Sequence, residues 1–241
     1  MIIIPDIHGR DFWEEAADKY QYEDFVFLGD YVDPYTEAEL IPSWAGIKAL
    51  KDVIDFKKKY PDRVTLLLGN HDLSYLSDLM PSCRFDYERG IEIYDLLREN
   101  TDLFKIAHTK QIGKKTYLFT HAGILRNWVE KNRGLFPSVD SIADMDKRFS
   151  ELFDTTDELF MALRQCSYCR GGDDPYGSCV WADIREHLFE MEKKVPDKDK
   201  NVYQVFGHTK MLTPMITSRF ACLDCQRPVM LDDENGNFKV L

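Results

Sequence analysis

The sequence has no long apolar run and little concentrated positive charge. No stretch of its 241 residues approaches the roughly 18 apolar residues that a membrane-spanning helix needs. The 31 Lys and Arg residues are outnumbered by 42 Asp and Glu residues, so the formal net charge is −11, and no basic cluster is longer than the run at residues 57–59. We therefore expect neither a membrane nor a long nucleic acid as a partner, since nucleic acids require clustered basic side chains.

A basic leader is also missing from the first residues, which read MIIIPDIHG. We expect a mature, soluble, cytoplasmic protein, because a secretory signal needs a longer apolar segment. Six cysteines include two CxxC pairs, at 166–169 and 222–225. Their separation exceeds the ~15–20 residues usual in a four-thiolate zinc site, so reduced thiols are one interpretation and a structural zinc site is the other.

Five apolar segments of strand length each end in Gly or Pro and polar residues. They are residues 1–4, 25–28, 64–68, 116–119 and 202–206. Helical patterns separate the first three, at 11–20 and after Ser43, a candidate N-cap for a helix containing Trp44 and Ile47. Alternating strands and helices indicate an α/β fold with a largely parallel sheet.

A long insertion, approximately residues 125–200, separates the fourth and fifth strands. It contains an apolar stripe around Phe149 and the capping-box pattern of Thr155 to Glu158, both typical of helices, and a further short helix is expected at about 184–194. We expect this insertion to cap the sheet of a single domain, residues 1–241. Further strands are expected at 221–223 and 229–231.

The polar residues that follow the five strands have side chains of the types that commonly bind metals. In open α/β sheets ligands bind at the carboxyl ends of the strands, where several loops converge. Carboxylate, imidazole and amide groups together suit Mn, Fe or Zn better than they suit calcium. The residues concerned are Asp6, His8, Asp30, Asp33, Asn70, His71, His121 and His208.

These motifs resemble the signature of the calcineurin-like metallophosphoesterase superfamily. The motifs are D-x-H-G at 6–9, G-D-x-x-D at 29–33, G-N-H-D at 69–72, T-H-A-G at 120–123 and G-H-T at 207–209. The spacing most resembles the phosphoprotein phosphatase branch and its bacterial relatives, which include symmetrical diadenosine tetraphosphatases. The segments GNHDL at 69–73 and HAGILRNW at 121–128 are similar to the corresponding motifs of these diadenosine tetraphosphatases.

The resemblance implies a four-layer sandwich of two mixed β-sheets flanked by helices, with a binuclear metal centre capped by the helical insertion. The two divalent ions would be Mn or Fe, with Zn also possible. By resemblance, the first metal would be bound by Asp6, His8 and Asp30, and the second by Asp30, Asn70, His121 and His208. Asp30 would then bridge two ions about 3.5–4 Å apart.

The same resemblance implies catalytic roles for His71 and Asp33. Asp33 would hold His71, which would protonate the leaving oxygen while a metal-bridging hydroxide attacks phosphorus. We expect a phosphatase that hydrolyses phosphate monoesters, acting on phosphorylated small molecules, nucleotides or phosphoproteins. The alternative is a dinucleoside polyphosphate (diadenosine tetraphosphate) hydrolase. Four aromatic residues could stack on its base, although aromatics at a groove would also serve a phosphopeptide: Trp128, Tyr168, Tyr176 and Trp181.

One departure from the resemblance concerns phosphate binding. Phosphoprotein phosphatases usually continue G-D-x-V-D with Arg-Gly, whereas this sequence continues with Pro34 and Tyr35. Without that arginine another cation must bind the phosphate, because a guanidinium group can donate two parallel hydrogen bonds to it. Arg170, beside a Gly-rich loop, is the first candidate and Arg10 the second.

Overall fold

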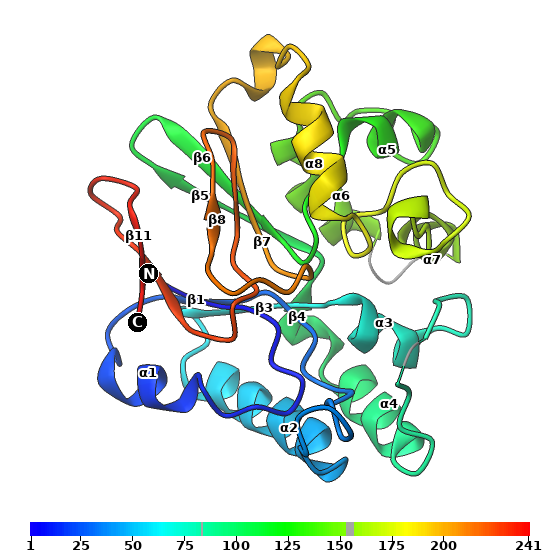
Figure 1. Ribbon diagram of the computed structural model, residues 1–241, viewed down its shortest axis with the longest axis vertical. Coiled ribbons are helices and arrows are strands. Elements are labelled where there is room, and N and C mark those ends of the chain that lie inside the picture. Colours follow the sequence, from blue (N-terminus) through cyan, green and yellow to red (C-terminus); the bar gives the residue numbers. More distant parts are fainter. Residues whose placement is uncertain (83, 153–156) are drawn as a thin grey trace. The chain divides into compact units, whose positions relative to one another are not determined.

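The structure is a computed structural model that describes residues 1–241 except 83 and 153–156 (Figure 1). The chain forms two compact units, one of Met1–Lys105 with Gln226–Leu241 and one of Ile106–Cys225. Each unit contains its own mixed β-sheet. The predicted α/β class with two mixed sheets is confirmed, whereas the layer order of the sandwich and the single domain over 1–241 stay predictions.

The first unit is built on a six-stranded sheet of order β11-β10-β1-β2-β3-β4. Strands β1 to β4 are parallel, and β10 and β11 extend the sheet in antiparallel pairing. Apolar side chains on both faces of β1 and β2 are buried, as expected for central parallel strands. The strands are β1 (Ile2–Ile4), β2 (Phe25–Phe27), β3 (Val64–Leu67), β4 (Phe104–Lys105), β10 (Val229–Leu231) and β11 (Phe238–Val240).

The helices of this unit follow the parallel strands. They are α1 (Glu14–Lys19), α2 (Trp44–Lys59), α3 (Asn70–Leu76) and α4 (Gly90–Glu99), with a 3₁₀ turn at Thr101–Leu103. Helix α2 buries an apolar face that includes Ile47 and Leu50. Ser43 holds the predicted N-cap position, but its side chain forms no capping hydrogen bond with the backbone. The Ser43 hydroxyl instead accepts a hydrogen bond from Arg89 at 3.1 Å.

The second unit is built on a five-stranded sheet of order β5-β6-β7-β9-β8. Strands β6, β7 and β9 are parallel, and β5 and β8 pair with them in antiparallel orientation. The predicted strands at 116–119 and 202–206 are therefore neighbours in space. The strands are β5 (Ala107–Ile112), β6 (Lys115–Thr120), β7 (Val202–Phe206), β8 (Met215–Ile216) and β9 (Phe220–Cys222).

The insertion between β6 and β7 is helical, as predicted. Its helices are α5 (Arg126–Lys131), α6 (Met145–Leu152), α7 (Asp157–Leu163) and α8 (Ile184–Met191), with 3₁₀ turns at Ile142–Asp144, Tyr168–Arg170 and Asp197–Asp199. Phe149 packs against Trp128, whose ring is fully buried. Trp128 is therefore a core residue and cannot stack on a base, so that expectation is wrong. The predicted capping box at Thr155 lies outside the described residues.

None of the helices in the described part of the chain combines the length and the apolar character needed to cross a lipid bilayer.

Candidate metal centre

Three parallel strands of the first unit end at one edge of its sheet. Strands β1, β2 and β3 are neighbours in register, with Ile4 opposite Phe27 and Phe27 opposite Leu66. The loops that follow them therefore start side by side. Those loops contain six of the predicted site residues, all of them buried: Asp6, His8, Asp30, Asp33, Asn70 and His71.

Several of these residues have a left-handed backbone. The φ angle is 46° at His8, 55° at Asp30 and 56° at Asp33. L-residues rarely adopt this conformation, which costs about 1–2 kcal/mol relative to the right-handed region. Such outliers concentrate at functional sites, where the surrounding structure maintains them. The loops after β1 and β2 thus turn sharply after their strands.

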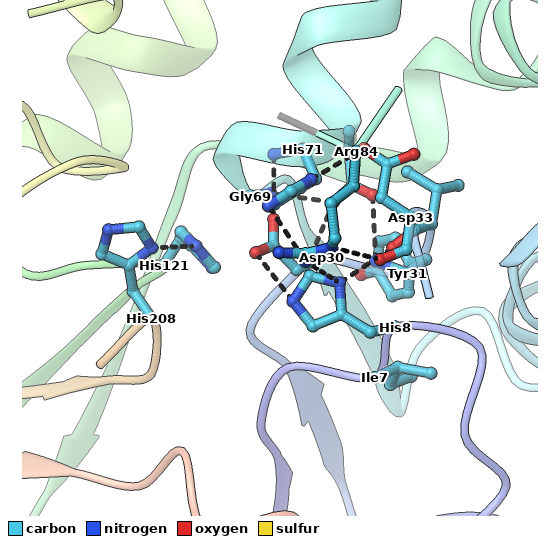
Figure 2. Close-up of polar contacts among 12 residues, drawn as sticks. Ile7, His8, Asp30, Tyr31, Asp33, Gly69, His71, Arg84, His121 and His208 are labelled. Atoms are coloured by element: carbon cyan, nitrogen blue, oxygen red, sulfur yellow. Dashed lines mark hydrogen bonds and ion pairs between the residues drawn. The ribbon is translucent and has the colours of Figure 1, made fainter. Parts of the chain in front are cut away.

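The side chains of His8 and Asp30 face each other (Figure 2). The Nδ1 atom of His8 lies 2.9 Å from the carbonyl oxygen of Val32, so Nδ1 must bear a proton and donate it to that oxygen. The Nε2 atom of neutral His8 then presents its lone pair to Oδ2 of Asp30, 3.4 Å away. Two facing lone pairs repel unless a proton or a metal ion lies between them. This donor pair fits a divalent metal ion.

The pKa values in this cluster move in the directions that burial dictates. Burial lowers the pKa of His8 well below its usual value, and the positive charges near it act in the same direction. Burial, followed by the nearby Asp72 carboxylate, raises the pKa of Asp30 well above its usual value. A neutral imidazole is the form that binds metals, and a divalent ion would offset the cost of ionising Asp30.

His71 forms a second close pair with Asp33. Its Nδ1 atom lies 2.7 Å from Oδ2 of Asp33, and the hydroxyl of Tyr75 donates to the other carboxylate oxygen. Burial raises the pKa of Asp33 to about 7, although the hydrogen bond from Tyr75 opposes this shift. The predicted partnership of Asp33 with His71 is thus present as a hydrogen bond, and it orients the Nε2 atom of His71 away from Asp33. Tyr75 was not anticipated from the sequence.

Asp72 also has a role that the sequence analysis missed. Its fully buried carboxylate accepts hydrogen bonds from the backbone N–H groups of Asp30 at 2.7 Å, Tyr31 at 2.9 Å and Gly69 at 2.9 Å. These bonds connect the loop after β2 to the start of α3. The signal was the fourth residue of the G-N-H-D motif, which is an aspartate that continues into a helix.

Glycine is required beside Asp30 for steric reasons. A Cβ atom on Gly69 would lie 2.1 Å from Oδ1 of Asp30, and one on Gly29 would lie 2.4 Å from the backbone nitrogen of Gly69. Gly29 also has a φ of 101°. The close approach lets the backbone N–H of His71 donate to Oδ1 of Asp30 at 3.0 Å. This bond fixes the Asp30 carboxylate.

In the second unit, two histidines follow the neighbouring parallel strands β6 and β7. The Nε2 atom of His121 lies 3.1 Å from Nδ1 of His208 (Figure 2). The backbone N–H of Gly207 donates to the carbonyl of His121 at 2.8 Å, which joins the two loops. His208 has a left-handed φ of 63°. Two imidazoles with adjacent ring nitrogens can contribute two ligands to one metal ion.

Arg170 supports the loop of His208. Its Nη2 atom donates to the backbone carbonyl of His208 at 3.0 Å and to the Thr209 hydroxyl at 2.8 Å. Its Nε atom lies 3.1 Å from a carboxylate oxygen of Asp183, which also caps helix α8. Arg170 stays a prediction as a substrate-binding residue, and these contacts give it a second role in positioning His208.

Arg10 and Arg84 differ in their partners. Arg10 forms a two-bond ion pair with Glu39, at 2.8 and 2.9 Å, and it also stays a prediction as a substrate contact. Arg84, which the sequence analysis did not consider, extends over the ring of Tyr35 and reaches the His8 and His71 imidazoles. Sequence alone gave no signal for Arg84.

The zinc alternative based on the CxxC pairs finds no support. Among the residues that the structure describes, no group of three metal-capable side chains includes a cysteine. The Cys222 thiol donates instead to the carbonyl of Gly207 at 3.4 Å.

Carboxylates and imidazoles gathered at strand ends of α/β units are the donor set of a metal-dependent hydrolase. The family model for calcineurin-like phosphoesterases matches residues 1–210. The chain therefore belongs to the calcineurin-like phosphoesterase family.

Similar proteins include serine/threonine phosphatases. One from Schizosaccharomyces pombe is 35% identical over 74 residues, which are 29% of this chain and 22% of that protein. The phosphatase sitA of Aspergillus fumigatus is 46% identical over 48 residues, 20% of this chain and 10% of that protein. The matches thus span about a fifth or less of these distant relatives.

Two solved structures are also similar to this chain. A protein serine/threonine phosphatase from Saccharomyces cerevisiae has a TM-score of 0.49 at 14% identity and covers 92% of this chain and 65% of its own. The phosphatase domain of the Legionella effector WipB has a TM-score of 0.46 at 12% identity and covers 81% and 78%, respectively.

Proposed function

We propose that this protein is a binuclear metallophosphatase that hydrolyses phosphate monoesters of the serine/threonine-phosphatase type. The observation that supports it best is the His71–Asp33 pair beside the facing His8 and Asp30 side chains. One pair offers a proton donor and the other a metal-binding edge within a single unit. The kinship with serine/threonine phosphatases favours a phosphate monoester over a dinucleoside polyphosphate.

We assign the metal ligands as the family motifs suggest. The ligands would be Asp6, His8, Asp30, Asn70, His121 and His208. Two divalent ions, Mn or Fe in the first instance, would lower the pKa of a bound water and offset charge on the phosphoryl oxygens when present. Their charge also explains how a protein with a net charge of −11 attracts an anionic substrate.

The protein's own proton chemistry belongs to His71. Asp33 fixes the ring through Nδ1, so Nε2 is left to donate a proton to the departing ester oxygen. The Tyr75 hydroxyl supports the Asp33 carboxylate by donating to its other oxygen. A leaving alkoxide thus becomes a neutral alcohol as it departs. The helical segment 125–200 would cap the site, and we place the protein in the cytoplasm.

The test compares Mn²⁺-dependent phosphate release from a phosphoserine peptide with cleavage of diadenosine tetraphosphate, using purified wild-type protein and Asp30→Asn. We expect faster turnover of the peptide, abolished in the variant. Faster cleavage of the dinucleotide would instead make the protein a nucleotide hydrolase. No turnover of either compound, with two metals bound per chain, would contradict the proposal.

A second variant separates metal binding from proton transfer. We expect His71→Asn to retain both metal equivalents by metal analysis while kcat falls by about 10²–10⁴, the usual contribution of a general acid. His121→Asn, by contrast, should lose bound metal. A His71→Asn protein that loses its metal but keeps its turnover per bound metal would reverse the assignment.

A further inference from the structure

Arg84 places a guanidinium group beside the His8 and His71 rings. It lies in the loop between α3 and α4, and its backbone has a left-handed φ of 58°. Its Nε atom donates to the backbone carbonyl of Asp33 at 3.2 Å. The guanidinium carbon lies 3.8 Å from the centroid of the Tyr35 ring, a cation–π contact. Two contacts thus fix the direction of this side chain.

The outer end of the guanidinium meets groups that do not neutralise it. Its Nη2 atom lies 3.4 Å from Nε2 of His71 and 3.5 Å from Nδ1 of His8. The second contact is not a hydrogen bond, because His8 Nδ1 already donates to Val32. Neither imidazole carries a negative charge, so this end of the guanidinium favours an anionic partner.

The carboxylates of Asp30 and Asp33 are near enough for the charge of Arg84 to act on them, in the direction that lowers both pKa values, but neither forms an ion pair with it. Within the described residues Arg84 forms no ion pair, whereas Arg10 is paired with Glu39 and Arg89 with Asp86. An arginine that lies over an aromatic ring and donates from Nε to a carbonyl can still donate from its two Nη groups to a ligand. That edge lies within reach of the general acid proposed above.

The sequence supplies a reason for this placement. Pro34 follows Asp33, and a proline has neither a cationic side chain nor a backbone N–H to bind phosphate. Tyr35 follows, and its ring supports the guanidinium of a residue some 50 positions later in the chain. The loop after α3 therefore delivers a cation to the region where the loop after β2 has none.

We propose that Arg84 binds the phosphoryl group of the substrate, donating from Nη1 and Nη2 to two of its non-bridging oxygens. This role rests on the proposed phosphatase function. Arg84 would orient the phosphorus so that the ester oxygen points toward Nε2 of His71. The specificity that follows is for a terminal phosphate, since a dianion with three free oxygens can accept both bonds and still contact the metals.

The test measures the affinity of Mn²⁺-loaded protein for inorganic phosphate by isothermal titration calorimetry. We expect Arg84→Ala to weaken phosphate binding about 10- to 100-fold, the effect of losing hydrogen bonds between charged groups. Arg84→Lys should recover only part of the loss, because an ammonium group cannot form two parallel bonds. The control is Arg98→Ala, which removes an exposed charge from α4 and should leave the affinity unchanged.

Metal content and melting temperature are measured for every variant. Wild-type protein that binds phosphate as tightly as Arg84→Ala, with equal metal content, overturns the role of Arg84 alone. Wild-type protein that binds two metals but no phosphate overturns the proposed function and this role with it. If Arg84→Ala loses its metal or melts early, Arg84→Gln replaces it, and equal affinity of Arg84→Gln and wild type again overturns the role.

Discussion

The buried carboxylate of Asp72 accepts the backbone N–H of Asp30 at 2.7 Å, so the bridging ligand assigned to the metals is positioned by a residue that need not touch them. Because Asp72 also accepts from Tyr31 and Gly69, it ties together the two loops that flank the site. Residues that orient metal ligands commonly affect metal affinity by 10- to 100-fold.

We expect Asp72→Asn to weaken Mn²⁺ binding within that range and to lower the free energy of unfolding by about 2 kcal/mol. The physical reason is that an amide –NH₂ group, which is a donor, replaces one accepting oxygen, so one of the backbone N–H groups faces another donor. Urea unfolding and metal titration measure the two effects. Asp95→Asn, on the exposed face of α4, is the matched control. Unchanged metal affinity in Asp72→Asn would contradict the positioning role.

Tyr75→Phe should lower kcat several-fold without loss of metal. The hydroxyl donates to Asp33 and accepts the backbone N–H of Asp86 at 2.7 Å, so its removal leaves both groups without that partner. The variant keeps the ring that stacks on Phe85, with centroids 4.2 Å apart. Steady-state kinetics with Mn²⁺ analysis check this expectation, and a kcat equal to that of wild type would show that Asp33 needs no second support.

Gly123→Ala should destabilise the second unit by about 2 kcal/mol or more. A Cβ atom there would lie 2.4 Å from Nε2 of His187, and the φ of 83° is itself unfavourable for alanine. Gly134→Ala is the control, because its Cβ would meet no heavy atom within 4 Å. The melting temperatures of both variants, measured by thermal unfolding, test this expected loss of stability. Equal melting temperatures would mean that the His187 ring moves aside at little cost.

Acid should destabilise the protein partly through His187. Burial lowers the pKa of this histidine from 6.5 to about 4, although its bond to the carbonyl of Ala122, at 2.9 Å, opposes the shift. Below pH 6.5 the unfolded chain takes up a proton at this imidazole, whereas the folded protein does so only near pH 4. Lowering the pH through this window therefore favours unfolding, by up to roughly 3 kcal/mol.

His187→Gln removes that titration while keeping an N–H that can donate to Ala122. We expect its free energy of unfolding, measured with urea between pH 7 and 4.5, to fall less steeply than that of wild type. Parallel curves for the two proteins would show that His187 does not titrate differently in the folded and unfolded states.

The strands and the ligand-bearing loops were predictable because their signals are local. Each apolar run ends in Gly or Pro and a polar residue, and parallel strands bring such ends to one edge of a sheet. The start of α3 was harder to predict from the sequence, because residues 70–72 directly follow a strand and were interpreted as the end of that strand. The structure shows that Asn70 and His71 belong to the first turn of a helix.

Arg84 and Asp72 were missed for a different reason. Their contacts depend on how the loops fold back on one another, and no periodicity or motif in the sequence predicts that loop conformation. Arg84 reaches the carbonyl of Asp33 across some 50 residues of chain, and Asp72 reaches Asp30 across 42 positions. Similarly, Trp128 was misread because an aromatic residue in a motif can as well belong to a core.

The left-handed backbone at Asp30 and Asp33 restricts which residues can replace them, apart from any chemistry. With φ near 55°, Gly, Asn, Asp and His are accommodated most readily, and β-branched residues are the least tolerated. A single substitution that removes a carboxylate here while sparing the loop is therefore best made to Asn or Gly. At these two positions the backbone favours short polar side chains, or no side chain, apart from any role in binding a metal.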